Sequence, residues 1–181
     1  MKSEETASAR YDGVADWYDE HVAWSTAAAA PLIARLAGRG SGWCLDVGCR
    51  TGIHLTALAE TGWSVVGVDA SADQLRVARR RAGPVVAGLV RADAARLPFR
   101  AGSCPLVVSA FTHTDVDDFT NLAREARRVL EADGRFIYVG LHPCFTGPSP
   151  SGHEPMVPAW SIPDMRGRAG RSAAQGRLEA A

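Results

Sequence analysis

The chain has 181 residues, with 20 basic and 20 acidic side chains, so its formal net charge is zero. This length predicts one domain of about 150 residues plus a remainder, and a hydrophobic content of 46% excludes a disordered chain. A neutral chain lacks the field that draws proteins to nucleic acids or anionic membranes. No apolar run approaches the ~18 residues of a membrane span, and no secretory signal follows the first charges, which predicts a cytoplasmic protein.

Two helices are predicted near the start of the chain. Apolar residues recur at helical spacing through residues 11–24, which predicts one amphipathic helix. A second helix is predicted through residues 32–36, with Pro31 in its first turn. It ends in the glycine-rich stretch 38–42.

Strands and helices then alternate regularly. Helices are predicted at residues 53–60, at residues 72–82 behind a capping box of Ser71 and Gln74, and after Asp115. Strands that are apolar on both faces and alternate with helices are typical of parallel pairing. The sequence therefore predicts a doubly wound, Rossmann-like α/β sheet. Its strands are expected at residues 43–47, 64–69, 85–90, 106–111 and 135–139.

Residues 147–181 differ in kind from the rest of the chain. They hold five glycines and five prolines and few aliphatic side chains beyond alanine and methionine. Such a composition cannot build a core, so it predicts a disordered tail or an extension laid onto the domain.

The four cysteines form no CxxC pair. In a chain without an export signal, this pattern favours reduced thiols over disulfides, and it predicts no metal site. They are Cys44, Cys49, Cys104 and Cys144.

Acidic residues stand at three successive strand ends, where a doubly wound sheet binds its ligands. The first strand opens into a turn from Asp46 to Gly52, whose glycines let the backbone approach a ligand. Asp69 ends the second strand, in position to accept hydrogen bonds from a ribose diol, and Asp93 follows the third. The dinucleotide fingerprint GxGxxG does not fit, because Arg50 occupies its second glycine position.

Four motifs resemble those of class I S-adenosylmethionine-dependent methyltransferases. LDVGCRTG, VVGVDAS, ADAARLPF and RVLEADGRFIYVG are similar to motifs I, post-I, II and III of that family. The resemblance covers roughly residues 11–142 and is closest to small-molecule methyltransferases of the ubiquinone and menaquinone biosynthesis type. YDGVADWYD resembles the N-terminal lid helix of that group, which makes 1–40 a helical lid, 41–146 a cofactor-binding core and 147–181 a tail.

The resemblance implies S-adenosylmethionine as the cofactor and a small molecule as the methyl acceptor. The turn from Asp46 to Gly52 would surround the methionine end, Asp69 would bind the ribose, and Asp93 would meet the adenine amino group. Ser109 would lie under the sulfonium. The implied cofactor-binding residues are Asp46, Gly48, Cys49, Gly52, Asp69, Ala70, Asp93, Ala94 and Ser109.

Methyl transfer is an in-line displacement in which the enzyme aligns the nucleophile and excludes water. A general base is needed only if the nucleophile must lose a proton. His113, in the loop after the fourth strand, is the candidate for that role, although a loop histidine that helps to start the next helix is the alternative.

Three departures from the family bear on activity. Arg50 stands at the middle glycine of the GxGxG turn, where its positive charge is expected to oppose a cationic ligand. The alternatives are a side chain that extends into solvent and one that pairs with the carboxylate of the ligand. Cys104 and Pro105 replace the usual Phe-Asp, and the last antiparallel strand pair of the family has no counterpart in the sequence. These departures leave open a second hypothesis: a catalytically weak or inactive protein that keeps the fold for cofactor binding or interaction.

Deleting residues 147–181 is expected to leave the melting temperature almost unchanged, because backbone that buries no core gains little from becoming ordered. Thermal unfolding of the full and shortened chains measures this. A drop of many degrees would show that the segment packs onto the domain.

Overall fold

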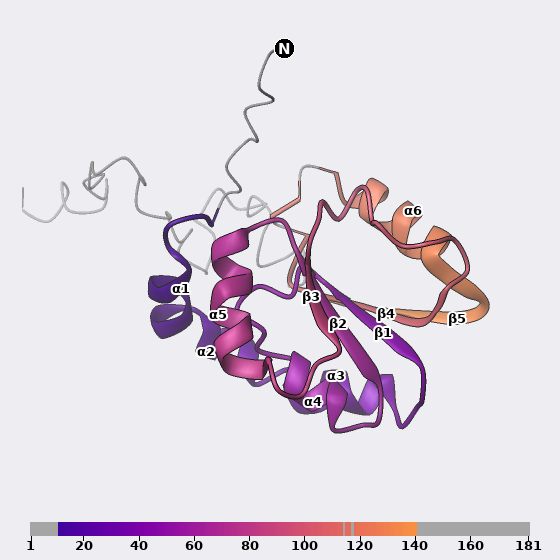
Figure 1. Ribbon diagram of the computed structural model, residues 1–181, viewed down its shortest axis with the longest axis horizontal. Helices are drawn as coiled ribbons and strands as arrows, with labels where there is room; N and C mark the ends of the chain where they lie inside the picture. The colour runs from indigo at the N-terminus through magenta and orange to yellow at the C-terminus, as the bar shows by residue number, and fades with distance from the viewer. Residues whose placement is uncertain (1–10, 114, 117, 141–181) are drawn as a thin grey trace, which may run out of the picture. The chain divides into compact units, whose positions relative to one another are not determined.

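Five parallel strands form a single sheet in the part of the chain that the structure describes (Figure 1). The computed structural model describes residues 11–113, 115–116 and 118–140. All described residues belong to one compact unit of the chain. The predicted tail, 147–181, therefore lies outside the described residues.

The sheet has the strand order β3-β2-β1-β4-β5, and every neighbouring pair is parallel. The strands are β1 (Trp43–Val47), β2 (Ser64–Asp69), β3 (Gly88–Arg91), β4 (Cys104–Ala110) and β5 (Leu130–Val139). The helices are α1 (Ala15–His21), α2 (Ala23–Ala27), α3 (Ala30–Ala37), α4 (Leu55–Ala59), α5 (Ala72–Ala82) and α6 (Phe119–Val129). This arrangement confirms the predicted doubly wound fold.

Each face of the sheet has its own apolar core. Successive side chains of a strand point to opposite faces, so Cys44 joins one core and Leu45 the other. The first core contains residues of α3, α4 and α5, such as Ile33 and Leu58. The second contains residues of α6, such as Leu122. Burial on both faces explains why the strands lack polar alternation.

The N-terminal helix predicted at residues 11–24 is wrong in its extent. Gly13 has a φ of 86°, which a right-handed helix does not contain, so residues 11–13 form a turn and α1 begins at Ala15. At Val22 the φ of −118° separates α1 from α2.

Several further element boundaries differ from the prediction. β4 begins at Cys104 rather than at Leu106, and α4 spans Leu55–Ala59 rather than residues 53–60. β3 begins at Gly88 rather than at Val85, because the Val85 N–H bonds to the carbonyl of Ala82 in a turn that follows α5. α6 begins at Phe119, because the carboxylate of Asp118 accepts from the Thr120 N–H and caps the helix. β5 begins at Leu130 and carries a register shift against β4, rather than beginning after Gly134.

Charged contacts attach α1 to α5. Asp73 at the start of α5 accepts hydrogen bonds from the N–H groups of Gly13 and Ala15, at 3.0 and 3.3 Å. Asp16 of α1 forms ion pairs with Arg76 and Arg80. These contacts hold the segment before α1 beside the carboxyl ends of the strands, where Tyr11 lies.

None of the described helices is long and apolar enough to cross a membrane.

Leu58→Ala is expected to lower the free energy of unfolding by roughly 2–5 kcal/mol, because the side chain is fully buried between α4 and the sheet. Leu36→Ala is the matched control: Leu36 is 44% exposed on α3, and its loss is expected to cost less than about 1 kcal/mol. Urea unfolding of both variants compares the two costs. Equal losses would contradict the packing described here.

Candidate functional site

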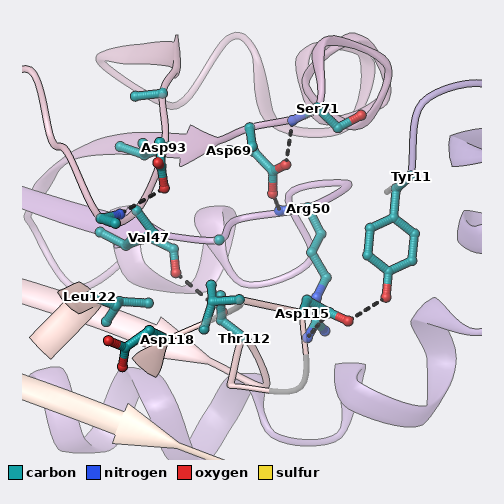
Figure 2. Close-up of a pocket in the computed structure, with 17 residues that line it drawn as sticks. Tyr11, Val47, Arg50, Asp69, Ser71, Asp93, Thr112, Asp115, Asp118 and Leu122 are labelled. Atoms are coloured by element: carbon teal, nitrogen blue, oxygen red, sulfur yellow. Dashed lines mark hydrogen bonds and ion pairs between the residues drawn. The ribbon is translucent and has the colours of Figure 1, made fainter. Parts of the chain in front are cut away.

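A pocket of about 430 Å³ lies at the carboxyl ends of β1, β2 and β3 (Figure 2). Its volume falls in the range typical of small-molecule sites. The turns that follow the first four strands supply most of its lining, and Tyr11 and Leu122 complete it. In an open parallel sheet, ligands bind where the strand order reverses, here between β1 and β4.

The carboxylate of Asp69 fixes two of these turns. One of its oxygens accepts the backbone N–H of Arg50 at 2.8 Å, and the other accepts that of Ser71 at 2.9 Å. Burial raises the pKa of Asp69, while the two N–H groups and the Arg50 charge oppose the rise. The carboxylate is thus held in one orientation at the pocket wall, as expected from its place at the end of β2.

Gly48 allows the turn after β1 to lie against the turn after β4. Its φ is 78°, and a Cβ at this position would overlap the side chain of Thr112. The Thr112 hydroxyl donates to the carbonyl of Val47 at 3.3 Å, and Gly48 itself donates to the carbonyl of Val68 at 2.8 Å. Gly48 lines the pocket, so the predicted glycine turn borders the predicted site.

Gly52 and Cys49 pack against neighbouring residues of the core rather than lining the pocket. A Cβ at Gly52, where φ is 78°, would come within 3.1 Å of Ala78 on α5, so glycine here permits close helix packing. Cys49 is buried beside Gly67, and burial raises the pKa of its thiol. Neither residue lines the pocket. Their cofactor-binding roles stay predictions.

Asp46 and Ser109 are buried in the strands behind the pocket and do not line it. Their side-chain oxygens accept or donate no hydrogen bond within the described residues. Burial raises the pKa of Asp46 to about 7, because the charged carboxylate is costly away from water, although the nearby Arg50 charge lowers it. The cofactor-binding role of each residue stays a prediction.

Ala70, Asp93 and Ala94 all line the pocket at the ends of β2 and β3, and their cofactor-binding roles stay predictions. One oxygen of Asp93 accepts the N–H of Ala95 at 2.8 Å, which fixes the turn that presents the carboxylate.

His113 does not line the pocket. Its ring packs edge-on against Tyr138, with 5.8 Å between ring centroids, and neither ring nitrogen has a hydrogen-bond partner among the described residues. Phe111 has a φ of 56°, so the chain turns sharply after β4 and directs Thr112 to the pocket. The catalytic role of His113 stays a prediction without a pocket contact to support it.

Arg50, Asp115 and Tyr11 form a polar cluster in the pocket that sequence reasoning did not assemble (Figure 2). The Arg50 Nη2 donates to the carbonyl of Phe111 and lies 3.7 Å from the Asp115 carboxylate. Asp115 also accepts the hydroxyl of Tyr11 at 2.7 Å. The Arg50 side chain is only 9% exposed, so it neither extends into solvent nor carries an uncompensated charge. The sequence signal for the contact between Arg50 and Asp115 is the position of Asp115 after β4, at the edge of the sheet where the turn containing Arg50 also lies.

Negatively charged side chains outnumber positively charged ones in the pocket. Among its described lining residues, Arg50 is the single cation, and the carboxylates are those of Asp69, Asp93, Asp115 and Asp118. This balance favours a ligand with positive charge and leaves one place for a negative group. No three His, Cys, Asp or Glu side chains gather as metal ligands in the described part of the chain.

A family model described as "Methyltransferase domain" matches residues 45–138. The demethylmenaquinone methyltransferase of Mycolicibacterium gilvum is 36% identical over 93 residues, which are 51% of this chain and 39% of that protein. The malonyl-[acyl-carrier protein] O-methyltransferase of Geobacter sulfurreducens is 34% identical over 136 residues, 72% of this chain and 51% of that protein. The chain thus spans about half or less of the length of these relatives.

Solved structures with the same fold include two methyltransferases. Geranyl diphosphate C-methyltransferase from Streptomyces coelicolor A3(2), crystallised with Mg²⁺, geranyl-S-thiolodiphosphate and S-adenosyl-L-homocysteine, has a TM-score of 0.59 at 24% identity. The match covers 69% of this chain and 48% of that one. A SAM-dependent methyltransferase from Aquifex aeolicus has a TM-score of 0.57 at 16% identity, covering 69% and 71%. At these identities the likeness shows the fold.

Asp46→Asn is expected to gain stability over the wild type as pH rises. A carboxyl whose folded pKa is raised keeps its proton in the folded chain, so the wild type loses stability between about pH 4, the unfolded pKa, and about pH 7. Asparagine does not titrate, so the difference in free energy of unfolding between the variant and the wild type grows over this pH window to at most roughly 4 kcal/mol. Above the window this difference is constant. Urea unfolding across the pH range measures it. Parallel pH profiles for the two proteins would contradict a titrating Asp46.

Proposed function

Because the chain belongs to the class I S-adenosylmethionine-dependent methyltransferases, whose cofactor is S-adenosylmethionine, we propose that it binds this cofactor in the described pocket and transfers the methyl group to a small molecule. The observation that carries the proposal is the row of carboxylates at the ends of β2 and β3, on a pocket of suitable volume. A nucleoside with a ribose diol and a positive sulfonium suits such a pocket.

The residues at the pocket fit the cofactor. Asp69 would accept hydrogen bonds from the two ribose hydroxyls, because each of its oxygens has a further lone pair beside the bond to a backbone N–H. Asp93 would accept from the adenine amino group, and Ala94 would offer its N–H beside it. Gly48 would let the backbone approach the methionine end.

When bound, the cofactor supplies an electrophilic methyl group. The side chains of the pocket orient the cofactor and exclude water. Asp69 and Asp93 orient the nucleoside. Tyr11, which is fixed by its hydrogen bond to Asp115, covers one side of the pocket. If the acceptor must lose a proton, Asp115 is a carboxylate that already faces the pocket, whereas His113 does not.

The acceptor is proposed to be a small molecule. The relatives are named for demethylmenaquinone and for malonyl groups on acyl-carrier protein, which supports this class without selecting a member. The proposal includes no nucleic acid or membrane partner, as the neutral charge balance of the sequence suggests, and it keeps the predicted cytoplasmic location.

The hypothesis of an inactive cofactor-binding or interaction protein rests on the missing last strand pair and on the charge of Arg50. The described residues bear on Arg50. Its compensation by Asp115 and by the Phe111 carbonyl removes the main physical objection to a cationic cofactor. We therefore do not favour that alternative.

Calorimetric titration with S-adenosylmethionine, S-adenosylhomocysteine and NAD tests the proposal. Binding of the first two at nanomolar to micromolar dissociation constants and no binding of NAD is the expected result. Binding of NAD alone would overturn it.

Asp69→Asn is expected to weaken S-adenosylhomocysteine binding by roughly ten- to a hundredfold, because ribose hydroxyls would lose a charged acceptor that is worth about 1.5–3 kcal/mol. Asp133→Asn, at an exposed position of β5, is the matched control and should bind as the wild type does. Calorimetry gives both constants. An unchanged constant for the Asp69 variant would mean that the ribose binds elsewhere.

A further inference from the structure

Arg50 presents a buried guanidinium inside the pocket. Two partners, the Phe111 carbonyl and the Asp115 carboxylate, engage the Nη2 atom, and the Tyr18 hydroxyl is a further hydrogen-bond partner of the side chain. A guanidinium has five N–H groups arranged in a planar fork, so Arg50 can donate to a ligand beside these contacts. The guanidinium carbon of Arg50 also lies over the Tyr18 ring, 6.0 Å from the ring centroid.

The backbone at Arg50 is in a conformation that favours glycine. Its φ of 52° lies in the left-handed region, which costs a residue with a Cβ about 1–2 kcal/mol. A buried cation on a strained backbone needs compensation, and Asp115 supplies part of it by holding the charge at the pocket wall. Substituting glycine would remove the strain, so the side chain has a use that outweighs it.

The charge pattern indicates what that use is. Arg50 is the single cation among the described lining residues, so a ligand carboxylate has one favourable place in a pocket of four carboxylates. Two parallel N–H bonds from one guanidinium to one carboxylate form the strongest pairing of this kind.

We propose that Arg50 is a specificity-determining residue that binds the carboxylate of the methionine end of the cofactor, with Asp115 as the positioning residue that aims its guanidinium. This inference rests on the proposed function. Of the alternatives that the sequence leaves open for Arg50, it selects pairing with the ligand carboxylate over repulsion of the cofactor. The protein then selects nucleosides that carry an intact amino-acid end.

Two neutral-sulfur ligands separate this contact from the rest of the pocket. S-adenosylhomocysteine carries the carboxylate, whereas 5′-methylthioadenosine shares its adenosine and sulfur and lacks the amino-acid end. Neither has a sulfonium charge, so repulsion from that charge plays no part. The ratio of their dissociation constants reports the amino-acid contact and cancels changes that affect adenosine binding equally.

Calorimetry on the full chain is carried out for the wild type, Arg50→Gln, Arg50→Lys and Asp115→Asn, with Arg127→Gln on the exposed surface of α6 as the matched control. In Arg50→Gln, S-adenosylhomocysteine binding is expected to weaken roughly ten- to a hundredfold, while 5′-methylthioadenosine changes by less than about twofold. Arg50→Lys keeps the charge without the fork and should retain part of the preference. Asp115→Asn should reduce the ratio too, and the control should not.

An unchanged ratio in Arg50→Gln, or equal affinity of the wild type for both ligands, would overturn the inference and leave the proposed function intact. Failure of the wild type to bind either ligand would overturn the proposed function as well. Melting temperatures show whether each variant is folded, and Arg50→Lys provides the comparison if the glutamine variant is not.

Discussion

The hydrogen bonds of the Asp69 carboxylate are the constraint on which the pocket depends. One oxygen holds the turn after β1 through the N–H of Arg50, and the other holds the start of α5 through the N–H of Ser71. The preceding carbonyl, that of Val68, accepts from Gly48 and Cys49. The end of β2 thus determines where the glycine turn lies, and this places the Arg50 side chain in the pocket. A change at Asp69 therefore affects both the proposed ribose contact and the backbone that carries the neighbouring groups.

The pocket combines a fixed charge pattern with a short segment from the N-terminal part of the chain. The turns after β2 and β3 present carboxylates, and the only described lining cation lies near the turn after β4. Tyr11 reaches this cation through Asp115, while Asp73 and the arginines of α5 hold the segment that contains Tyr11. Two regions of the ligand would therefore meet different electrostatic environments, an acidic one at the nucleoside and a mixed one at its opposite end.

The sequence predicted the elements whose signals are local. The bounds of β2 follow from one uninterrupted apolar run that ends in an acid, and those of α5 from a capping serine and helical spacing. Ser71 does accept from the Gln74 N–H, although the Gln74 side chain is buried without a partner among the described residues, so only half of the capping box forms. β3 was misplaced because Val85 has high strand propensity but is held in a turn by its bond to Ala82.

The parts of the site that were missed depend on contacts between distant residues. Asp69, Ala70, Asp93 and Ala94 could be placed because strand ends in this fold meet at one edge. The pairing of Arg50 with Asp115 depends on the path of the loop after β4. In that loop Phe111 adopts a left-handed φ, which no local sequence motif predicts. The same bend explains why Thr112, and not His113, lines the pocket.

A crystal structure of the protein with S-adenosylhomocysteine tests the central claim most directly. The account predicts the adenosine in the pocket at the ends of β2 and β3, with both ribose hydroxyls within hydrogen-bond distance of the Asp69 carboxylate and the Arg50 N–H bond to Asp69 preserved. Ligand density elsewhere on the protein, or a ribose that makes no contact with Asp69, would contradict it.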